Sequence, residues 1–518
     1  MIYPQLDEFL KLTRNYNLIP VARTLLADTE TPIRVFQQFH EEEYAFLLES
    51  VEGGAKWARY SFIGTDPFLV VRGKSGVIEV QGKDGRETFA EQPIHALRSL
   101  LNRFKSPQYD DYPLFMGGAV GFFGYDLLRY YEKKIPPHPA DDLNMNDIQF
   151  MFCDQLIVFD HFKQTMMVVA NAHVPEDAGE SERVRAYHEA VERVEAMTER
   201  LQGAGRTNAY GFVPKSAAAP AVIDADELHS NLTKEEFIFN VEQAKEYIRA
   251  GDIFQVVLSQ RFEMETDASP LHVYRVLRTM NPSPYMYYLK MAGERIVGTS
   301  PELLVRVEGG KLHTRPIAGT RPRGKSPEQD KAYERELLAD EKEKAEHLML
   351  VDLGRNDLGR VSVPGSVQVD SFMEIERYSH VMHLVSNVSG TMRNDCDFYD
   401  ALLSCMPAGT VSGAPKLRAM EVIAELEHES RGAYAGAIGY LGFSGNLDTC
   451  ITIRTIIFRE GKAYVQAGAG IVWDSVPEKE YEETINKAKG MLTAIKTAEV
   501  IFGGEPKGRV TVNQDYFG

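Results

Sequence analysis

The sequence predicts an α+β protein built mainly of antiparallel strands. Short apolar or alternating segments recur with brief turns between them, which is a hairpin pattern. Helical segments are interspersed among these strands, without the regular strand–helix alternation of a doubly wound sheet. A stretch rich in Gly, Ala, Pro and Ser covers 203–225 and is typical of a connector. We therefore expect an N-terminal lobe over 1–202, a second lobe over 226–505 and a C-terminal tail over 506–518.

The N-terminal lobe is expected to be rich in hairpins. Its predicted strands cover 44–50, 68–72, 76–80, 117–126, 155–160 and 165–170. The second and third of these have a hairpin pattern, and so do the last two. Glycines spaced along the fourth strand predict the close approach of another backbone. A long polar helix is expected at about 176–202.

The second lobe is expected to begin with a helix over 234–250, capped by Thr233 with Glu236 three residues later. Further helices are predicted over 270–280, 327–353 and 477–498. Ser326 and Gln329 predict a capping box at the start of the 327–353 helix. The predicted strands of this lobe cover 253–259, 285–291, 295–307, 311–315, 434–443, 449–458 and 463–470, with 295–307 and 311–315 paired as a hairpin.

Composition limits the possible classes of protein. The 518 residues are long enough for two to four domains, and 57 basic against 75 acidic residues give a net charge of −18. This charge argues against a nucleic-acid-binding protein, which needs a basic face. The four cysteines form no C-x-x-C pair and predict neither a disulfide framework nor a zinc site. The acidic N-terminus lacks the apolar core of a signal peptide, so we expect a cytoplasmic protein without a membrane span.

The stretch PAGTVSGAPK at 407–416 predicts a tight loop that feeds the start of a helix. Backbone N–H groups and the hydroxyl of Thr410 would then lie near the positive end of that helix, which suits an anion. An ordinary loop and N-cap explain the same residues.

Two glutamate pairs suggest a metal site. Glu343 and Glu346 share one face of a predicted helix, and Glu480 and Glu483 repeat this spacing on the last helix. If the two helices face each other, the pairs supply hard oxygen ligands suited to Mg²⁺. The alternative is two solvated helix faces, since Glu483 and Lys487 have the spacing of a surface ion pair.

Three further polar residues lie in unusual settings. Arg454 lies within an apolar predicted strand and needs an ion-pair partner or an exit to solvent. Glu302 ends a predicted strand and would be a proton donor if buried, although a carboxylate after a turn is more often solvated. His383 lies among apolar residues, which is also typical of a hydrogen-bonded core histidine.

These motifs resemble those of the chorismate-binding enzymes. PAGTVSGAPKLRAMEVI is similar to the family signature, most closely to that of component I of the anthranilate synthases. The segments E-x-x-E-H-L-M-L-V-D-L-x-R-N-D-L-G and E-Y-E-E-x-x-N-K-A resemble further family motifs, and the likeness extends from LLES to NKAKG. The resemblance implies a two-lobed fold with antiparallel β-sheets packed face to face and helices outside.

The resemblance also implies roles for individual residues. Glu346 and Glu483 would ligate Mg²⁺, with Glu343 and Glu480 close by, and the metal would hold the ring carboxylate of the substrate. The other substrate contacts implied are Gly319, Tyr434, Arg454, Gly468, Ala469, Gly470 and Lys487. Among these, Tyr434 and Arg454 would clamp the enolpyruvyl carboxylate.

The implied catalytic residues are Glu302, His383, Thr320 and Thr410. Glu302 would protonate the departing C4 hydroxyl, and His383 would take part in the elimination of pyruvate. The two threonines would line the same pocket.

Two positions distinguish members of the family. Aminodeoxychorismate synthases commonly carry a nucleophilic lysine where this chain has Ala318, and isochorismate synthases carry a water-activating lysine at Gln255. The resemblance therefore implies that ammonia attacks chorismate, giving anthranilate and pyruvate. No cysteine lies in a G-x-C-x-G elbow, which implies a separate glutaminase subunit, in a hetero-oligomer with two copies of each chain. Aminodeoxychorismate synthase is the alternative enzyme.

Two segments resemble the tryptophan feedback site of this family. Their residues are Leu48, Glu49, Ser50, Pro282, Pro284, Tyr285 and Met286. A core strand and a proline-rich turn explain the same residues without a ligand. A catalytically silent, tryptophan-sensing homologue is the alternative of a different class.

Overall fold

The computed structural model describes residues 2–51, 59–203, 229–378 and 381–503. The predicted connector beyond Gly203 and the predicted tail lie outside these ranges, and the lobe boundaries remain predictions. Within the described residues, every helix is too short or too polar to cross a membrane.

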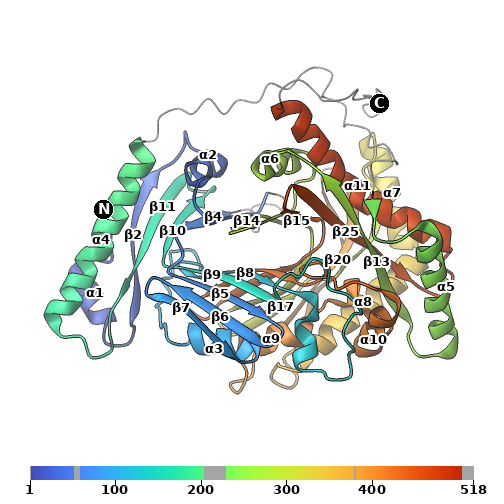
Figure 1. The fold of residues 1–518 in the computed structure, drawn as a ribbon, viewed down its shortest axis with the longest axis horizontal. Coiled ribbons are helices and arrows are strands. Elements are labelled where there is room, and N and C mark those ends of the chain that lie inside the picture. Colours follow the sequence, from blue (N-terminus) through green and yellow to red (C-terminus); the bar gives the residue numbers. More distant parts are fainter. Residues whose placement is uncertain (1, 52–58, 204–228, 379–380, 504–518) are drawn as a thin grey trace.

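Two large antiparallel sheets form the body of the protein (Figure 1). The first sheet has the order β1 (Ile2–Tyr3), β2 (Leu18–Leu26), β11 (Thr165–His173), β10 (Gln155–Asp160), β4 (Tyr60–Thr65), β3 (Tyr44–Glu49), β14 (Tyr285–Met291), β15 (Glu294–Ser300), β24 (Thr455–Arg459), β25 (Lys462–Ile471), β13 (Gln255–Glu265) and β12 (His229–Ser230), with β21 (Gly413–Ala414) also paired to β13. The second sheet has the order β18 (Ile317–Pro322), β20 (Val381–Thr391), β17 (Lys311–Thr314), β16 (Leu303–Glu308), β23 (Leu447–Ile451), β22 (Ala437–Gly442), β8 (Gly118–Phe123), β9 (Ile148–Cys153), β5 (Leu69–Lys74), β6 (Val77–Gly82) and β7 (Gly85–Ala90), with β19 (Gln368–Arg377) also paired to β20. Each sheet joins strands from both halves of the chain, through β3 with β14 and through β8 with β22.

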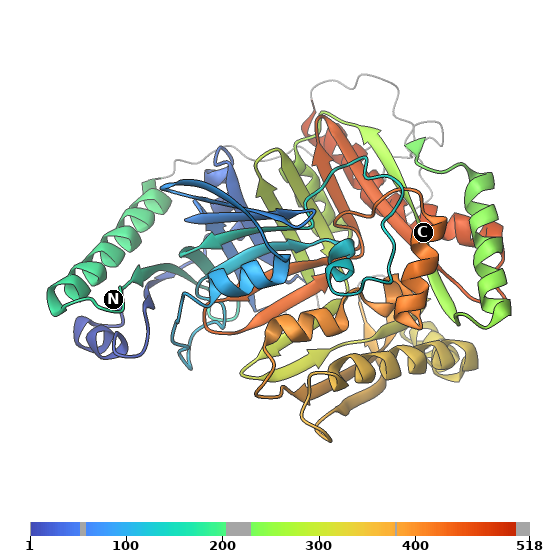
Figure 2. The ribbon, with the colours of Figure 1, turned by 60° about the horizontal axis from the view of Figure 1, so that its bottom comes forward.

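Helices lie outside these sheets. They are α1 (Leu6–Leu12), α2 (Pro32–Phe36), α3 (Pro93–Leu101), α4 (Glu180–Gly203), α5 (Lys234–Ala250), α6 (Pro270–Met280), α7 (Pro327–Ala339), α8 (Glu341–Gly359), α9 (Phe398–Cys405), α10 (Lys416–Leu426) and α11 (Pro477–Phe502), with short 3₁₀ turns η1 (Gln37–Phe39), η2 (Tyr125–Tyr130) and η5 (Gly409–Val411). In Figure 1, α6 and α11 lie above the first sheet and α3 and α9 below the second. Figure 2 shows α7 and α8 (gold) at one edge of the molecule, where α8 packs on α9. The predicted α+β class is confirmed.

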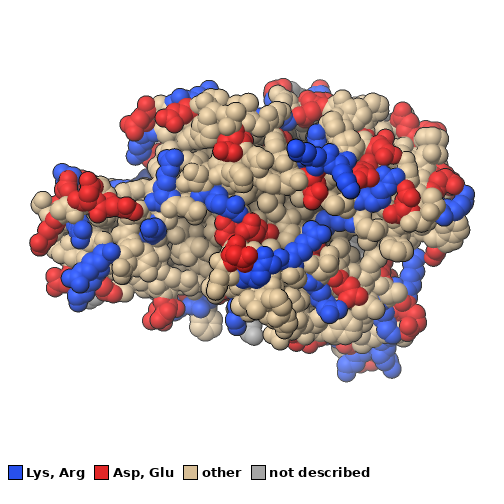
Figure 3. Space-filling model, turned by 90° about the horizontal axis from the view of Figure 1, so that it is seen from below, with Lys and Arg blue, Asp and Glu red and all other residues tan. Residues whose placement is uncertain are grey.

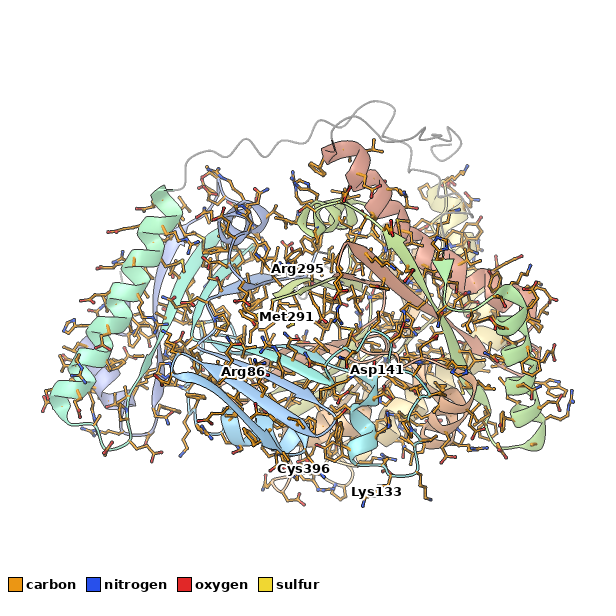
Figure 4. The ribbon with its side chains drawn as sticks, viewed as in Figure 1. Arg86, Lys133, Asp141, Met291, Arg295 and Cys396 are labelled. Atoms are coloured by element: carbon orange, nitrogen blue, oxygen red, sulfur yellow. The ribbon has the colours of Figure 1, made fainter. Side chains whose placement is uncertain are left out.

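Apolar side chains from both sheets meet in the core between them. Phe46 and Leu289 of the first sheet and Phe122 and Ile438 of the second belong to one buried cluster. Met291, labelled in Figure 4 at the end of β14, belongs to the same cluster and is 1% exposed. Burial of each such side chain contributes about 1.5–3 kcal/mol, which accounts for the face-to-face packing of the sheets.

Local sequence signals explain several element boundaries. The predicted capping box of α5 is present, because Thr233 and Glu236 each accept a backbone N–H from the other. The glycines of β8 permit close pairing, since a Cβ at Gly118 would collide with the carbonyl oxygen of Leu441. The predicted capping box of α7 is incomplete: Ser326 accepts the N–H of Gln329, but the Gln329 side chain accepts from the N–H of Lys325.

The predicted strand at 295–307 is wrong as a single element. It is two strands in different sheets, β15 and β16, separated by Pro301 and Glu302. Proline lacks the N–H that a continuous ladder needs, so pairing stops there. The predicted hairpin therefore involves only β16 and β17.

The predicted strand at 449–458 also divides, into β23 of the second sheet and β24 of the first. Arg454 lies in the crossing with a φ of 51°, a left-handed conformation unusual for arginine. The apolar pattern of the sequence did not reveal this crossing, because apolar residues continue through it.

The predicted helix at 327–353 is two helices, α7 and α8, which meet at Asp340. The Asp340 carboxylate accepts the backbone N–H groups of Lys342 and Glu343 and so begins α8. The new helix places Glu343 in its first turn.

Charged side chains of both signs are interspersed on the face shown in Figure 3. This face shows no continuous basic stripe of the kind that binds nucleic acid.

Candidate active site

A cavity of about 660 Å³ lies at the two strand crossings. Its walls come from β13, β18, β20, β25, α8 and α11 and from the loop that contains η5. The crossing between β15 and β16 contributes Glu302, and the crossing between β23 and β24 contributes Arg454. All four predicted catalytic residues and all four predicted metal ligands line this one cavity.

Glu302 has the environment of a proton donor. Burial raises the pKa of its carboxyl to about 8, although a hydrogen bond from Thr410 and the charge of Lys487 oppose this shift. Thr410 Oγ1 donates to Glu302 Oε1 at 3.1 Å. With a pKa near 8, most Glu302 carboxyls carry a proton at pH 7. The solvated alternative for Glu302 is therefore disfavoured.

His383 lies across the cavity on β20. Its Nδ1 is 3.3 Å from the carbonyl oxygen of Gly319 and 3.0 Å from Thr320 Oγ1. Because a carbonyl oxygen only accepts, we assign the proton to Nδ1, which leaves Nε2 with a lone pair. Burial lowers the pKa of the imidazole, so the ring is neutral at pH 7. A neutral His383 can accept a proton through Nε2.

Arg454 carries a guanidinium without a carboxylate partner. Among the described residues it forms no ion pair, and its Nη1 donates only a long hydrogen bond, 3.5 Å, to the carbonyl oxygen of Lys487. Burial lowers its pKa, with the nearby Tyr434 and Glu483 opposing the shift. A half-buried guanidinium with unused donors is suited to an anionic ligand. The ion-pair alternative from the sequence is not observed.

Tyr434 and the glycines of β25 complete this part of the wall. Burial raises the pKa of the Tyr434 phenol to about 12, so the hydroxyl is a neutral donor. A Cβ at Gly468 would lie 2.8 Å from that hydroxyl, so only glycine leaves room for the ring. Gly470 also lines the cavity, whereas Ala469 between them is fully buried and does not. Lys487 Nζ donates to the carbonyl oxygen of Gly468 at 2.9 Å.

The four glutamates face the cavity from two helices, α8 and α11. Burial and then neighbouring glutamate charges raise the pKa of Glu346, and burial raises that of Glu480. Glu343 pairs with Arg321 at 3.1 Å, and Glu483 pairs with Lys487 at 2.7 Å.

The chemistry of this donor set fits Mg²⁺, which prefers carboxylate oxygens. Burial is the main cause of the raised pKa values of Glu346 and Glu480, and repulsion from neighbouring glutamates adds to it. Within the part of the chain that the structure describes, no three Asp, Glu, His or Cys side chains converge on one point closely enough to form a complete site. Further ligands would have to come from substrate or water.

The two positions that distinguish family members, Gln255 and Ala318, both line the cavity. The sequence analysis assigned no role to the other lining residues, among them Val257, Ile317, Lys342, Leu350, Val411, Ile453, Gln466, Asp474, Ser475 and Lys479. The two-residue period of a strand was an available signal for two of them: Val257 follows Gln255 on β13, and Gln466 precedes Gly468 on β25.

A second cavity, of about 310 Å³, lies where β3 pairs with β14. The predicted inhibitor residues that line it are Leu48, Glu49, Ser50, Pro284, Tyr285 and Met286, whereas Pro282 does not. The Glu49 carboxylate accepts from the Tyr274 hydroxyl at 2.7 Å and from Arg278 Nε at 3.1 Å. The hydroxyl of Ser50 is buried and has no hydrogen-bond partner among the described residues. Residues from both halves of the chain therefore line this cavity.

Comparison with known proteins identifies related chains. The family model described as chorismate binding enzyme matches residues 46–493. Anthranilate synthase component 1 of Acetivibrio thermocellus is 54% identical over 502 residues, covering 96% of this chain and 99% of that protein. The protein of the same name from Aquifex aeolicus is 48% identical, covering 95% and 98%. The crystal structure of anthranilate synthase component I from Streptococcus pneumoniae has 39% identity and a TM-score of 0.73, covering 90% of this chain and 99% of that one.

Proposed function

The chain belongs to the family of chorismate-binding enzymes, and on this premise we propose that it converts chorismate and ammonia to anthranilate and pyruvate. The observation that carries the proposal is a single cavity that contains the half-buried carboxyl of Glu302, the imidazole of His383 and the guanidinium of Arg454. Within the described residues, this guanidinium forms no ion pair. This combination supports binding of an anion, donation of one proton and acceptance of another.

In the first step, the ammonia nitrogen forms a bond to the ring, the C4–O bond breaks and the hydroxyl leaves as water. The attached nitrogen then loses one proton to solvent, which leaves a neutral amine. Arg454 and Tyr434 hold the enolpyruvyl carboxylate, and Glu302 gives its proton to the departing hydroxyl. The raised pKa of Glu302 supports this role, because the acid is protonated before the reaction. The product of the step is aminodeoxyisochorismate.

In the second step, the ring loses a proton and the bond from the ring to the enolpyruvyl oxygen breaks. The group leaves as enolpyruvate, which takes up one proton to become pyruvate. The lone pair of His383 Nε2 accepts the ring proton, while Gly319 holds Nδ1–H and fixes the ring orientation. Loss of these groups makes the ring aromatic and gives anthranilate.

The side chains near the ring favour ammonia as the nucleophile. Ala318 has no nucleophilic atom, and Gln255 is no base for the activation of water. Ala318 supports the proposal over aminodeoxychorismate synthase, and Gln255 supports it over an isochorismate synthase. The full set of polar residues in the cavity argues against a catalytically silent homologue.

Mg²⁺ is the proposed cofactor, with Glu346 and Glu483 as ligands and Glu343 and Glu480 beside them. When bound, it would offset the repulsion between the ring carboxylate and the glutamates. The fit of the donor set supports this assignment.

Glu346→Gln is expected to weaken Mg²⁺ binding by at least about tenfold, because an anionic oxygen ligand becomes neutral. Calorimetric titration of Mg²⁺ without chorismate and Mg²⁺ titration of anthranilate formation both measure this change. Glu341→Gln is the matched control, since Glu341 is an exposed residue of the same helix. An unchanged Mg²⁺ affinity in Glu346→Gln would exclude Glu346 as a ligand.

The central test of the function is anthranilate fluorescence from purified chain with chorismate, Mg²⁺ and ammonium. Appearance of anthranilate is the expected result. A product of the aminodeoxychorismate type instead would show that the role assigned to Ala318 is wrong, and no product at all would favour the silent homologue.

A glutaminase partner is proposed as the source of ammonia, in a hetero-oligomer with two copies of each chain. A glutaminase of this kind needs a reactive cysteine, and the cysteines of this chain do not suit that role. Three of the four are buried, and the fourth, Cys396, is partly buried with a raised pKa. This supports a separate subunit. These free thiols also suit the proposed cytoplasmic location.

Tryptophan is the proposed feedback inhibitor, bound in the second cavity. We expect Ser50→Phe to fill part of this cavity and to raise the tryptophan concentration needed for half-inhibition by about tenfold or more, an effect of at least 1.4 kcal/mol. Anthranilate formation measured against tryptophan concentration tests this, with exposed Ser181→Phe as the control. Unchanged inhibition of Ser50→Phe would place the inhibitor elsewhere.

A further inference from the structure

One ion pair behind the active-site wall is completely enclosed. The side chain of Arg431 is 0% exposed, and that of Glu427 is 6% exposed. Arg431 Nε donates to Glu427 Oε2 at 2.7 Å, and Nη2 donates to Oε1 at 2.6 Å. This two-point geometry fixes the plane of the guanidinium.

The remaining donors of Arg431 reach two residues that line the cavity. Nη1 donates to the carbonyl oxygen of Val411 at 2.7 Å, and Nη2 also donates to that of Val257 at 2.8 Å. The guanidinium thereby ties the loop that contains η5 to strand β13.

Glu427 extends the network to a third wall. Its Oε1 accepts the backbone N–H of Ser259 at 2.7 Å and the Ser259 hydroxyl at 3.0 Å. The Ser259 oxygen in turn accepts from Gln466 Nε2 at 2.9 Å, and Gln466 lines the cavity from β25.

Two aromatic rings flank the guanidinium. Its carbon lies 4.6 Å from the centre of the Tyr125 ring and 5.6 Å from that of Tyr434. The backbone N–H of Tyr434 also donates to the carbonyl oxygen of Arg431 at 3.1 Å. Arg431 therefore lies against the ring that is proposed to hold substrate.

Stability alone is a poor explanation for this pair. Burial of two charges costs free energy, and well-packed apolar residues often serve equally well. What apolar residues lack is a set of donors aimed at specific carbonyl oxygens. The carbonyl held by Nη1 belongs to Val411, the neighbour of Thr410, whose hydroxyl donates to Glu302.

We propose that Arg431 and Glu427 are positioning residues that hold Thr410 against Glu302 and the Tyr434 ring against the substrate. This inference rests on the proposed function. Neither residue touches the cavity directly, so each acts through the groups it holds. Burial raises the pKa of Glu302, and the described polar groups that oppose this shift are Thr410 and Lys487. Arg431 acts on the first of these groups through Val411.

Arg431→Lys tests the proposal, because lysine keeps the charge but loses the planar fork. Displacement of catalytic groups by about 1 Å costs up to roughly 100-fold, so we expect kcat with chorismate and ammonium to fall about 10- to 100-fold. The Thr410 hydrogen bond lowers the pKa of Glu302, so its loss moves the alkaline limb of the pH profile to higher pH. KM for chorismate is expected to rise as Tyr434 shifts.

Arg193→Lys is the matched control. Arg193 lies on α4, which contributes no residue to the cavity, and forms a half-buried ion pair with Asp154 at 2.6 Å. The near-UV circular dichroism, kcat and pH profile of the Arg193→Lys protein are expected to match those of the unaltered protein.

A folded Arg431→Lys protein with unaltered kcat and pH profile would overturn the proposal. If that variant does not fold, Glu427→Gln, which keeps the shape of the side chain, decides the question by the same two measurements. The unaltered protein tests the proposed function separately. If it forms no anthranilate, the proposed function is wrong, whereas normal activity in the unaltered protein together with normal activity in the variants refutes only the positioning role.

Discussion

Glu302→Gln is expected to lower kcat for chorismate with ammonium by about 10²–10⁴-fold. Glutamine keeps the size of the side chain and can still accept from Thr410, but it has no acidic proton to give to the leaving hydroxyl. Binding of chorismate, measured by calorimetry, should change little, because Arg454 and Tyr434 remain in place.

The pH dependence gives this prediction a second test. The Glu302 pKa of about 8 lies above the ordinary value of 4.5, so the acid is protonated below pH 8 and loses its proton above it. In the unaltered protein, kcat/KM should therefore fall about tenfold for each pH unit above about 8. Residual activity of Glu302→Gln should lack this limb.

Glu460→Gln is the matched control, because Glu460 is 82% exposed and lies between β24 and β25. We expect it to have normal activity. Near-normal kcat in a folded Glu302→Gln protein would remove Glu302 as the acid and leave its raised pKa as a consequence of burial alone.

Arg454→Met is expected to have the second-largest effect, a fall in kcat/KM of about 100-fold or more. Hydrogen bonds to a charged group contribute about 1.5–3 kcal/mol each, and a guanidinium clamp makes two of them with a carboxylate. Most of the loss should appear as a higher KM for chorismate, since the clamp holds substrate before and during the reaction.

The kcat/KM of Arg454→Lys should lie between those of Arg454→Met and the unaltered protein, because lysine keeps the charge but lacks the planar fork of the guanidinium. Arg185→Met, at a 69% exposed position on α4, controls for loss of a positive charge and should leave KM unchanged. If Arg454→Met bound chorismate with normal affinity, the unpaired guanidinium would need another ligand.

Much of this protein follows from sequence patterns because the responsible forces are local. Helical periodicity and the Thr233 cap were sufficient to place α5, and alternation placed the hairpin of β10 and β11. The motif residues predicted to act together do line one cavity, although their roles still await the experiments above.

Other features depend on contacts between residues far apart in the chain. The apolar runs at 295–307 and 449–458 look continuous, yet each divides where the chain passes from one sheet to the other. Which sheet a strand joins depends on its partners, and the sequence pattern of one strand does not contain them. These crossings bring Glu302 and Arg454 into the same cavity.

The sequence by itself determined the α+β class, most helices and hairpins, and the residues that carry the proposed chemistry. Only the tertiary structure decided their electrostatic state, because the pKa of Glu302 and the unpaired charge of Arg454 depend on burial by distant segments. The proposed positioning role of Arg431 and Glu427 also depends on the tertiary structure, because Arg431 donates to a carbonyl oxygen 174 positions away along the chain. Local patterns specify elements, whereas burial and partners exist only after those elements pack.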